Sequence, residues 1–90
     1  MDKHFLLIYD YVGEMAERRG PYREAHLARI AAEQEAGAIV MAGALGDPPN
    51  GGAFVFRGVE RDHVEAFVDA DPYVQAGLVT GRRIERWTLV

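Results

Sequence analysis

The sequence predicts a small α+β domain in which two helices cover one face of a four-stranded antiparallel sheet. Segments rich in β-branched and aromatic residues alternate with segments whose apolar residues recur at helical spacing, and glycine or proline separates them. The resulting order is strand, helix, strand, strand, helix, strand. Because 90 residues leave room for only one hydrophobic core, residues 1–90 are expected to form a single domain.

The first half of the chain predicts a strand, a loop and a helix. Residues 4–11, HFLLIYDY, are aliphatic and aromatic with no turn residue inside, which is typical of a strand. The polar residues 12–20 predict a connecting loop. Gly20-Pro21 then opens a helix, since proline is tolerated at the first helical position, and Gly37 supplies its stop. The residues predicted to form its buried stripe are Leu27, Ile30 and Ala31.

The second half predicts a hairpin followed by a second helix. Residues 38–45, AIVMAGAL, and residues 53–57, AFVFR, predict strands joined by the turn-rich loop 46–52. Asp62, with Glu65 three residues later, gives a capping-box-like helix start. The residues predicted to be buried on this helix are Val64, Phe67 and Val68.

A proline ends the second helix and opens a further short turn. Asp71-Pro72 stops the helix because the residue before proline disfavours the α region. The same pair predicts one more turn, with Asp71 as N-cap and Gly77 as terminator. Residues 82–89 predict the last strand. This βαββαβ order is typical of the ferredoxin-like sandwich.

Both faces of the predicted sheet are apolar, although two helices can cover only one of them. The segments HFLLIY and AFVF supply apolar residues to both faces. Because an open apolar face of this extent is unfavourable in a monomer, the sequence predicts a homodimer in which two sheets pair.

Composition excludes several classes of function. The net charge of −4 argues against a nucleic-acid surface, which needs a dense basic face. NGGAFVFR loosely matches an RNA-binding motif, but Gly52 and Arg57 occupy positions that need aromatic rings. No apolar stretch approaches the roughly 20 residues of a membrane span, and the start does not fit a signal peptide, so a cytoplasmic location is expected.

The sequence predicts neither a cofactor nor a metal, since it contains no glycine fingerprint and no metal-ligand spacing. It contains no cysteine and no serine, so a thiolate or serine nucleophile is excluded. Proton transfer is therefore favoured over nucleophilic catalysis.

The predicted topology brings one histidine and one aspartate together. The end of the first strand, the start of the first helix, loop 46–52 and the segment after the second helix all lie at one end of the sheet. His26 and Asp71 are expected to touch there. An aspartate that accepts from one ring nitrogen leaves the other nitrogen free to exchange a proton with a substrate.

Simpler interpretations of these residues stay open at this point. Asp71 could act only as a helix cap, and His26 could be a structural histidine bonded to a carboxylate. Arg23 could clamp a carboxylate or phosphate, or pair with Glu17, Glu24 or an acid of a second subunit. His4 and His63 are poorer site candidates than His26. The aromatic residues for which a core or interface role is favoured are Tyr9, Tyr11, Tyr22 and Trp87.

Three segments of the chain resemble the YCII-related proteins: YREAHLARI (22–30), EAGAIVMAGAL (35–45) and DADPYVQAGL (69–78). The most specific pieces are Arg-x-x-His-Leu and Asp-Pro-Tyr-Val-x-Ala-Gly. The resemblance covers nearly the whole chain and implies a single YCII-related domain that forms a dimeric α+β barrel.

The resemblance also implies a site. His26 would be the base or acid and Asp71 its partner, while Arg23 and Tyr73 would bind substrate in the pocket. The family chemistry it implies is lyase- or isomerase-like, on small organic acids or ring compounds. Loop 46–52 does not follow the family pattern, so the substrate does not transfer.

Two functions of different classes follow from the sequence. The first is an enzyme that uses His26 and Asp71 for general acid–base chemistry on a small organic substrate. The alternative is a non-catalytic module that binds a small molecule or another partner on the same dimeric scaffold.

Overall fold

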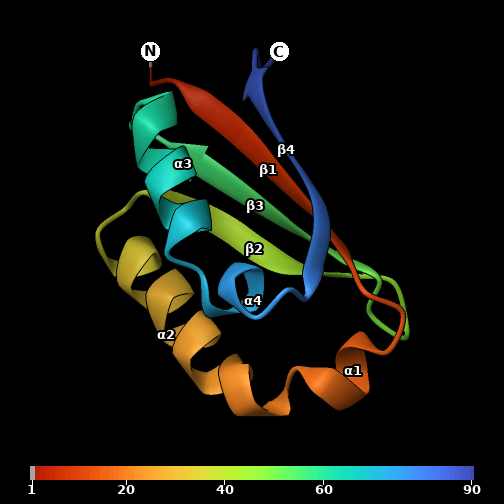
Figure 1. Cartoon of the computed structure of the whole chain (residues 1–90). Coiled ribbons are helices and arrows are strands. Elements are labelled where there is room, and N and C mark those ends of the chain that lie inside the picture. Colours follow the sequence, from red (N-terminus) through yellow and green to blue (C-terminus); the bar gives the residue numbers. More distant parts are fainter. Residues whose placement is uncertain (1) are drawn as a thin grey trace.

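The computed structural model, which describes residues 2–90, consists of one antiparallel sheet and a layer of helices (Figure 1). The elements in chain order are β1 (His4–Tyr11), α1 (Met15–Arg18), α2 (Gly20–Glu35), β2 (Ile39–Leu45), β3 (Gly51–Arg57), α3 (Arg61–Asp69), α4 (Pro72–Gln75) and β4 (Val79–Trp87). The strand order is β2-β3-β1-β4, and α2 and α3 lie on the same side of the sheet. This arrangement is the ferredoxin-like α+β fold, so the predicted fold class is confirmed.

The core lies between the sheet and the helices, and the alternation of β1 builds its centre. Phe5, Leu7 and Tyr9 are buried toward the helices, whereas the intervening residues of β1 point to the other face. On β3, Phe54 and Phe56 lie beside Leu7 and Phe5 in the register and share their face. Both phenyl rings pack edge-on against Phe67 of α3, with ring centroids 5.7 and 5.4 Å apart.

The opposite face of the sheet is apolar over β1, β2 and β3, carries Glu85 and Arg83 on β4, and is not covered by any described part of the chain. We call it the open face and define it by Leu6, Ile8, Met41, Ala53 and Val55. Val55 is at its centre, because it pairs with Leu6 on one side and Met41 on the other. The Met41 side chain is on edge strand β2 and is 62% exposed.

The predicted loop 12–20 is wrong in part, because it contains the short helix α1. The sequence of this helix is mostly polar, but its one buried residue, Met15, is completely buried and packs in a small cluster with Tyr73 and Leu78. A four-residue helix has no stability of its own, so this packing holds it in place.

The predicted buried stripe of α2 is also wrong in part. The residues that α2 buries are His26 and Ile30, while Ala31 is exposed and Leu27 is 41% exposed. The helix is rotated relative to the prediction because His26 turns inward to a buried hydrogen-bond partner, described below. Leu27 instead borders a cavity between α2 and the sheet.

The buried stripe of α3 is confirmed, since Val64, Phe67 and Val68 are its buried residues. The predicted cap is wrong. The helix begins at Arg61, with Glu60 at the N-cap position, and no side-chain hydrogen bond from Glu60, Arg61 or Asp62 caps it. Asp62 lies in the first turn, where a negative charge is favourable beside the helix N-terminus.

Strands β3 and β4 begin earlier than the sequence predicted. Gly51 and Gly52 belong to β3 rather than to the loop. Both positions are glycine because the neighbouring strand β1 leaves no room for a side chain. A Cβ atom on Gly51 would lie 2.5 Å from the Tyr9 carbonyl oxygen, and one on Gly52 would lie 2.7 Å from the Tyr11 hydroxyl. β4 begins at Val79, which pairs with Tyr11 past a bulge.

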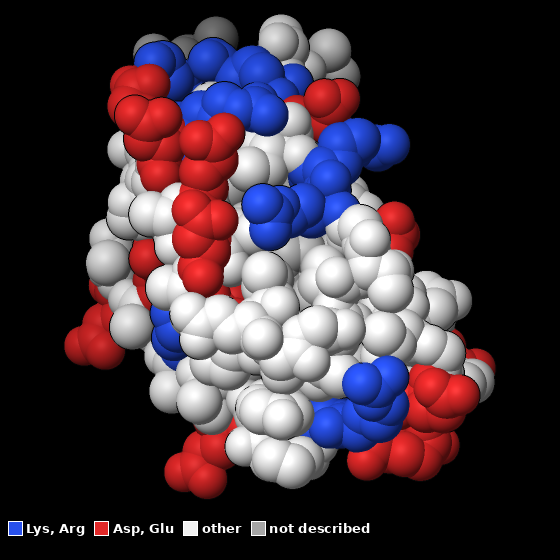
Figure 2. All heavy atoms as spheres, viewed as in Figure 1, with Lys and Arg blue, Asp and Glu red and all other residues white. Residues whose placement is uncertain are grey.

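Charged side chains of both signs are interspersed on the face drawn in Figure 2, with one group at the end of the sheet that carries the two termini and another at the lower right of the view. Ion pairs form at the end with the termini, between Lys3 and Glu60 at 2.6 Å and between Arg61 and Glu65 at 3.3 Å. Within residues 2–90, no helix is both long and apolar enough to cross a membrane.

Met15→Ala tests the anchoring of α1. We expect the free energy of unfolding to fall by about 2–5 kcal/mol, because the substitution leaves a cavity among buried side chains. Urea denaturation followed by circular dichroism measures the change. Glu17→Ala, on the exposed side of the same helix, is the control and should change the free energy by less than about 0.5 kcal/mol. Equal effects of the two substitutions would contradict the anchoring.

Candidate functional site

Several connections converge at the end of the sheet opposite the chain termini. The backbone N–H of Tyr11 donates to the Asn50 carbonyl at 2.9 Å, and that of Val12 donates to the Leu78 carbonyl at 3.0 Å. The end of β1, the β2–β3 loop and the segment after α4 therefore meet here, as the predicted topology required.

The carboxyl group of Asp71 is at the centre of this end and is fully buried. Oδ1 accepts the backbone N–H of Tyr73 at 3.0 Å, so Asp71 is the N-cap of α4, as predicted. Oδ1 also lies 2.8 Å from Nδ1 of His26, and Oδ2 accepts the Tyr9 hydroxyl at 2.8 Å. Asp71 is thus both a helix cap and the partner of His26. Because both of its oxygens act as acceptors, Nδ1 of His26 carries a hydrogen and donates it.

The imidazole of His26 is held on two sides. Its ring stacks on the Tyr73 ring with centroids 3.7 Å apart and an angle of 12° between the planes. Nε2 has no hydrogen-bond partner among residues 2–90, yet every fully buried polar side-chain atom of these residues has one. Nε2 must therefore reach open space, although the His26 residue as a whole is only 4% exposed.

Tyr9 lies in the buried core, as the sequence predicted, and its hydroxyl also supports the site by its hydrogen bond to Asp71, which was not predicted. It is fully buried, and burial raises the pKa of its hydroxyl far above the usual value of 10.0, with the neighbouring Asp71 charge adding to the increase. The hydroxyl therefore keeps its proton and remains a donor to Asp71. The sequence did contain a signal for this contact, because Tyr9 places a phenol on the inward face of β1, at the end of the sheet where Asp71 was expected.

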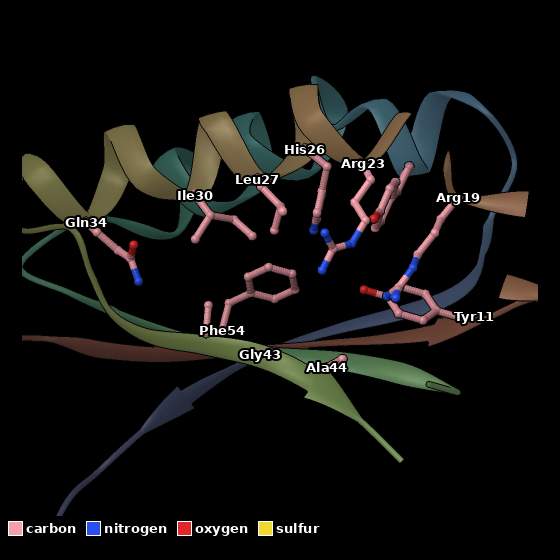
Figure 3. A pocket seen from close by; sticks show the side chains of 12 residues that line it. Tyr11, Arg19, Arg23, His26, Leu27, Ile30, Gln34, Gly43, Ala44 and Phe54 are labelled. Carbon is pink, nitrogen blue, oxygen red and sulfur yellow. The ribbon is translucent and has the colours of Figure 1, made fainter. Parts of the chain in front are cut away.

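A cavity of about 330 Å³ separates α2 from strands β2 and β3 (Figure 3). The side toward α2 is lined by Arg23, His26, Leu27, Ile30 and Gln34. The side toward the sheet is lined by Tyr11, Ala42, Gly43, Ala44 and Phe54. Arg19 and Tyr73 complete the lining. The volume is at the lower end of the range for small-molecule sites, which suits a ligand of about one ring.

The structure brings all four predicted site residues to this cavity or its wall. Arg23, His26 and Tyr73 line it, and Asp71 lies directly behind His26. Arg23 forms no ion pair with Glu17, Glu24 or any other described residue. Two interpretations of Arg23 therefore stay open: it clamps an anion, or it pairs with an acidic residue of a second subunit. Arg19 was missed because residues 12–20 were interpreted as a loop.

The other two histidines lie outside the cavity. Nε2 of His63 is 2.8 Å from Oε2 of Glu33 and links α3 to α2 near the surface, while Nδ1 of His4 contacts the Asp2 carbonyl oxygen at 3.2 Å. In the part of the chain that the structure describes, no three histidine, aspartate or glutamate side chains cluster in a way that could hold a metal ion.

Fold and site together define a class: a ferredoxin-like α+β domain with a buried imidazole–carboxylate pair beside a small cavity. The sequence profile of the YCII-related domain matches residues 3–88. The chain therefore belongs to the YCII-related family, and the resemblance seen in its motifs is confirmed.

Several solved structures share the fold, including two that match over nearly the whole chain. The first is 5-chloro-2-hydroxyhydroquinone dehydrochlorinase (TftG) from Burkholderia phenoliruptrix AC1100 in complex with 2,5-dihydroxybenzoquinone. It has 25% sequence identity and a TM-score of 0.80, over 94% of this chain and 93% of that one. The second is a protein from Bacteriodes thetaiotaomicron VPI-5482 assigned as an antibiotic biosynthesis monooxygenase. It has 12% identity and a TM-score of 0.61, over 99% and 90% of the two chains, and supports the fold alone. Curated protein sequences gave no match.

Two substitutions of Asp71 separate its capping role from its charge. Asp71→Ala removes the acceptor for three groups and should lower the free energy of unfolding by about 2–4 kcal/mol. Asp71→Asn keeps one acceptor oxygen and a residue favoured at N-caps, so it should lose less than half as much. Urea denaturation measures both changes. Asp69→Ala, at an exposed position nearby, is the control, and an Asp71→Ala change as small as that of the control would refute the role of the carboxylate.

Proposed function

We propose that the protein is an enzyme that performs general acid–base chemistry on a small ring compound, with His26 as the proton-transferring group. The observation that carries this proposal is the 2.8 Å contact between Asp71 and Nδ1 of His26, which leaves Nε2 free beside the cavity. Arg23 and Tyr73 are proposed to contact the substrate, because both line the same cavity.

The contact with Asp71 prepares the imidazole for proton transfer. Since Nδ1 carries a hydrogen, the lone pair of the neutral ring is on Nε2 and can accept a proton from the substrate. The imidazolium that forms is stabilised by the adjacent carboxylate. In an elimination, the electron pair released at the deprotonated atom forms a new double bond as the leaving group departs with its own pair. In an isomerisation, Nε2 returns the proton to a different substrate atom.

The structural relative supports the ring-compound proposal. TftG, which matches over nearly the full length of both chains, is a dehydrochlorinase of a chlorinated hydroxyhydroquinone. Removal of hydrogen chloride from a ring requires a group that takes up a proton, and His26 is the group in this cavity suited to that role at neutral pH. At 25% identity the relative suggests a class of reaction and leaves the substrate of this chain open.

His26→Gln tests the assignment with 5-chloro-2-hydroxyhydroquinone and its unchlorinated and methylated analogues as substrates. We expect the wild-type protein to transform at least one of them. Chloride release and ultraviolet–visible spectra measure the reaction. The substitution should lower kcat by about 100- to 10,000-fold, the usual contribution of a general acid or base. Asp71→Asn should lower kcat as well.

The matched control is His63→Gln, which removes another carboxylate-bonded histidine outside the cavity and should leave kcat unchanged. Ligands that bind without turnover, with an affinity indifferent to His26→Ala, would support the non-catalytic binding module and contradict the enzyme.

We also propose that residues 1–90 act as one domain and that two copies pair through the open face. The open face is apolar over β1, β2 and β3 and lies opposite the helix layer, so a second sheet could cover it without disturbing the cavity side. Pairing would remove Met41 and Val55 from water, which favours association of two copies.

Val55→Lys places a charge at the centre of the open face and should convert the dimer to a monomer. Sedimentation velocity at micromolar concentration should give the wild-type protein twice the 10.0 kDa mass of one chain. The variant should sediment as a single chain. Ala28→Lys, on the exposed side of α2, is the control and should remain dimeric. A wild-type protein that sediments as one chain would rule out the pairing.

A further inference from the structure

The chemistry of the cavity changes from one end to the other. Along α2, the residues Arg23, Leu27, Ile30 and Gln34 recur at intervals of three or four, so they lie on one helix face and line the cavity. Arg19, one helical turn before Arg23, extends this row at the end next to Tyr11 (Figure 3). The cavity is therefore cationic at one end, apolar along its middle and neutral but polar at the other end.

The two arginines at the cationic end have no partner within the described chain. Neither Arg19 nor Arg23 forms an ion pair or a side-chain hydrogen bond with any of residues 2–90. The nearby carboxylate, Asp71, is already bonded to three other groups. The guanidinium groups of Arg57, Arg61 and Arg82 each lie 3.3–3.9 Å from a carboxylate, whereas Arg18, Arg83 and Arg86, like Arg19 and Arg23, have no ion pair with any of residues 2–90. Of the arginines without an ion pair, Arg19 and Arg23 are the two that line this cavity.

The positive potential of these arginines reaches into the cavity. Burial raises the pKa of the Tyr73 hydroxyl, and the charges of Arg19 and Arg23 oppose that increase. Arg19 also opposes the increase that burial causes in the pKa of Tyr11. Both hydroxyl groups belong to residues that line the cavity, so a negative group placed beside them would be stabilised by the same charges.

The middle of the cavity suits a flat ring. Leu27 and Ile30 line it on the helix side, and the Phe54 ring and Ala42 line it on the sheet side. The Phe54 ring also packs edge-on against the His26 imidazole, with centroids 6.1 Å apart. A ring that rests against Phe54 would therefore lie next to Nε2, the unpartnered nitrogen.

We propose that Arg19 and Arg23 form an anion subsite that binds an ionised oxygen of a single-ring substrate, while the ring rests against Phe54 and its reacting atom faces Nε2 of His26. This inference rests on the proposed function, since it assigns the substrate class of the same cavity. Guanidinium groups bind such oxygens through charge-assisted hydrogen bonds. When Nε2 removes a proton, the electron pair left on the substrate increases the negative charge on that oxygen, and the arginines stabilise the increase.

Benzoate and benzamide test the subsite, because they have nearly the same shape and differ in charge. Titrations followed by calorimetry and by amide NMR shifts should show benzoate binding at least about tenfold more tightly to the wild-type protein, as expected for charge-assisted hydrogen bonds. Arg19→Gln and Arg23→Gln should each reduce benzoate affinity several-fold, and together they should abolish the preference. Benzamide affinity should stay the same in all variants. Acetate, which has the charge without the ring, should bind more weakly than benzoate.

The matched control is Arg18→Gln, since Arg18 is the exposed neighbour of Arg19 and does not line the cavity. It should bind both probes like the wild-type protein. Equal affinity for benzoate and benzamide, no binding of either probe, or an equal loss of benzoate affinity in Arg18→Gln would overturn the proposal.

His26→Gln separates this inference from the proposed function. The variant should keep the preference for benzoate while losing turnover of a ring substrate. A retained preference with unchanged turnover would refute the role of His26 and leave the subsite standing. Turnover that depends on His26, without any preference for benzoate, would refute the subsite alone.

Discussion

The buried carboxylate of Asp71 joins three separate parts of the chain at one point. It binds the Tyr9 hydroxyl from β1, the His26 imidazole from α2 and the backbone N–H at the start of α4. A carboxylate taken out of water is strongly unfavourable unless hydrogen bonds and charges compensate it. The helices can therefore pack on the sheet only in the arrangement that supplies these donors, and this constraint explains why α2 turns His26 inward with Ile30 and leaves Leu27 and Ala31 exposed.

The same contacts give the site its geometry before any ligand arrives. Nδ1 of His26 is tied to Asp71, the Tyr73 ring covers one face of the imidazole, and Nε2 is directed to open space. Groups held in this way need no reorganisation when a substrate binds, which is the condition under which a positioned base is most effective. The elements that stabilise the fold at this end and those that would transfer a proton are therefore the same side chains.

The sequence predicted the parts of the fold that depend on local patterns. β1, the buried stripe of α3 and the cap at Asp71 follow from a run of aliphatic and aromatic residues without a turn residue, from helical spacing and from the Asp-Pro pair. The contact between His26 and Asp71 followed from topology, because connectivity alone brings the two segments to one end. The motif resemblance added Tyr73.

The parts that the sequence did not predict depend on tertiary contacts. α1 has a polar sequence, and its stability comes from one buried side chain that meets Tyr73 and Leu78 from distant parts of the chain. The glycines at the start of β3 are typical of a loop, but a close approach of β1 explains them. Tyr9 looks like an ordinary core aromatic until its partner across 62 residues is known. Arg19 was not predicted as a site residue either, because it directly follows α1, which the sequence did not predict.

The attachment of α1 has a consequence for motion near the cavity. The sheet is held by continuous ladders between neighbouring strands, whereas α1 is four residues long and is anchored by Met15 alone among its residues. Segments with few buried contacts open locally at a much smaller free energy than global unfolding. Amide hydrogens of α1 should thus exchange with solvent far sooner than those of β1, and each such opening would release the hydrogen bond from the Arg19 backbone N–H to the Met15 carbonyl, next to the cavity wall. Local opening of α1 would therefore loosen one end of the cavity wall, while Asp71 and Tyr73 hold the imidazole in place.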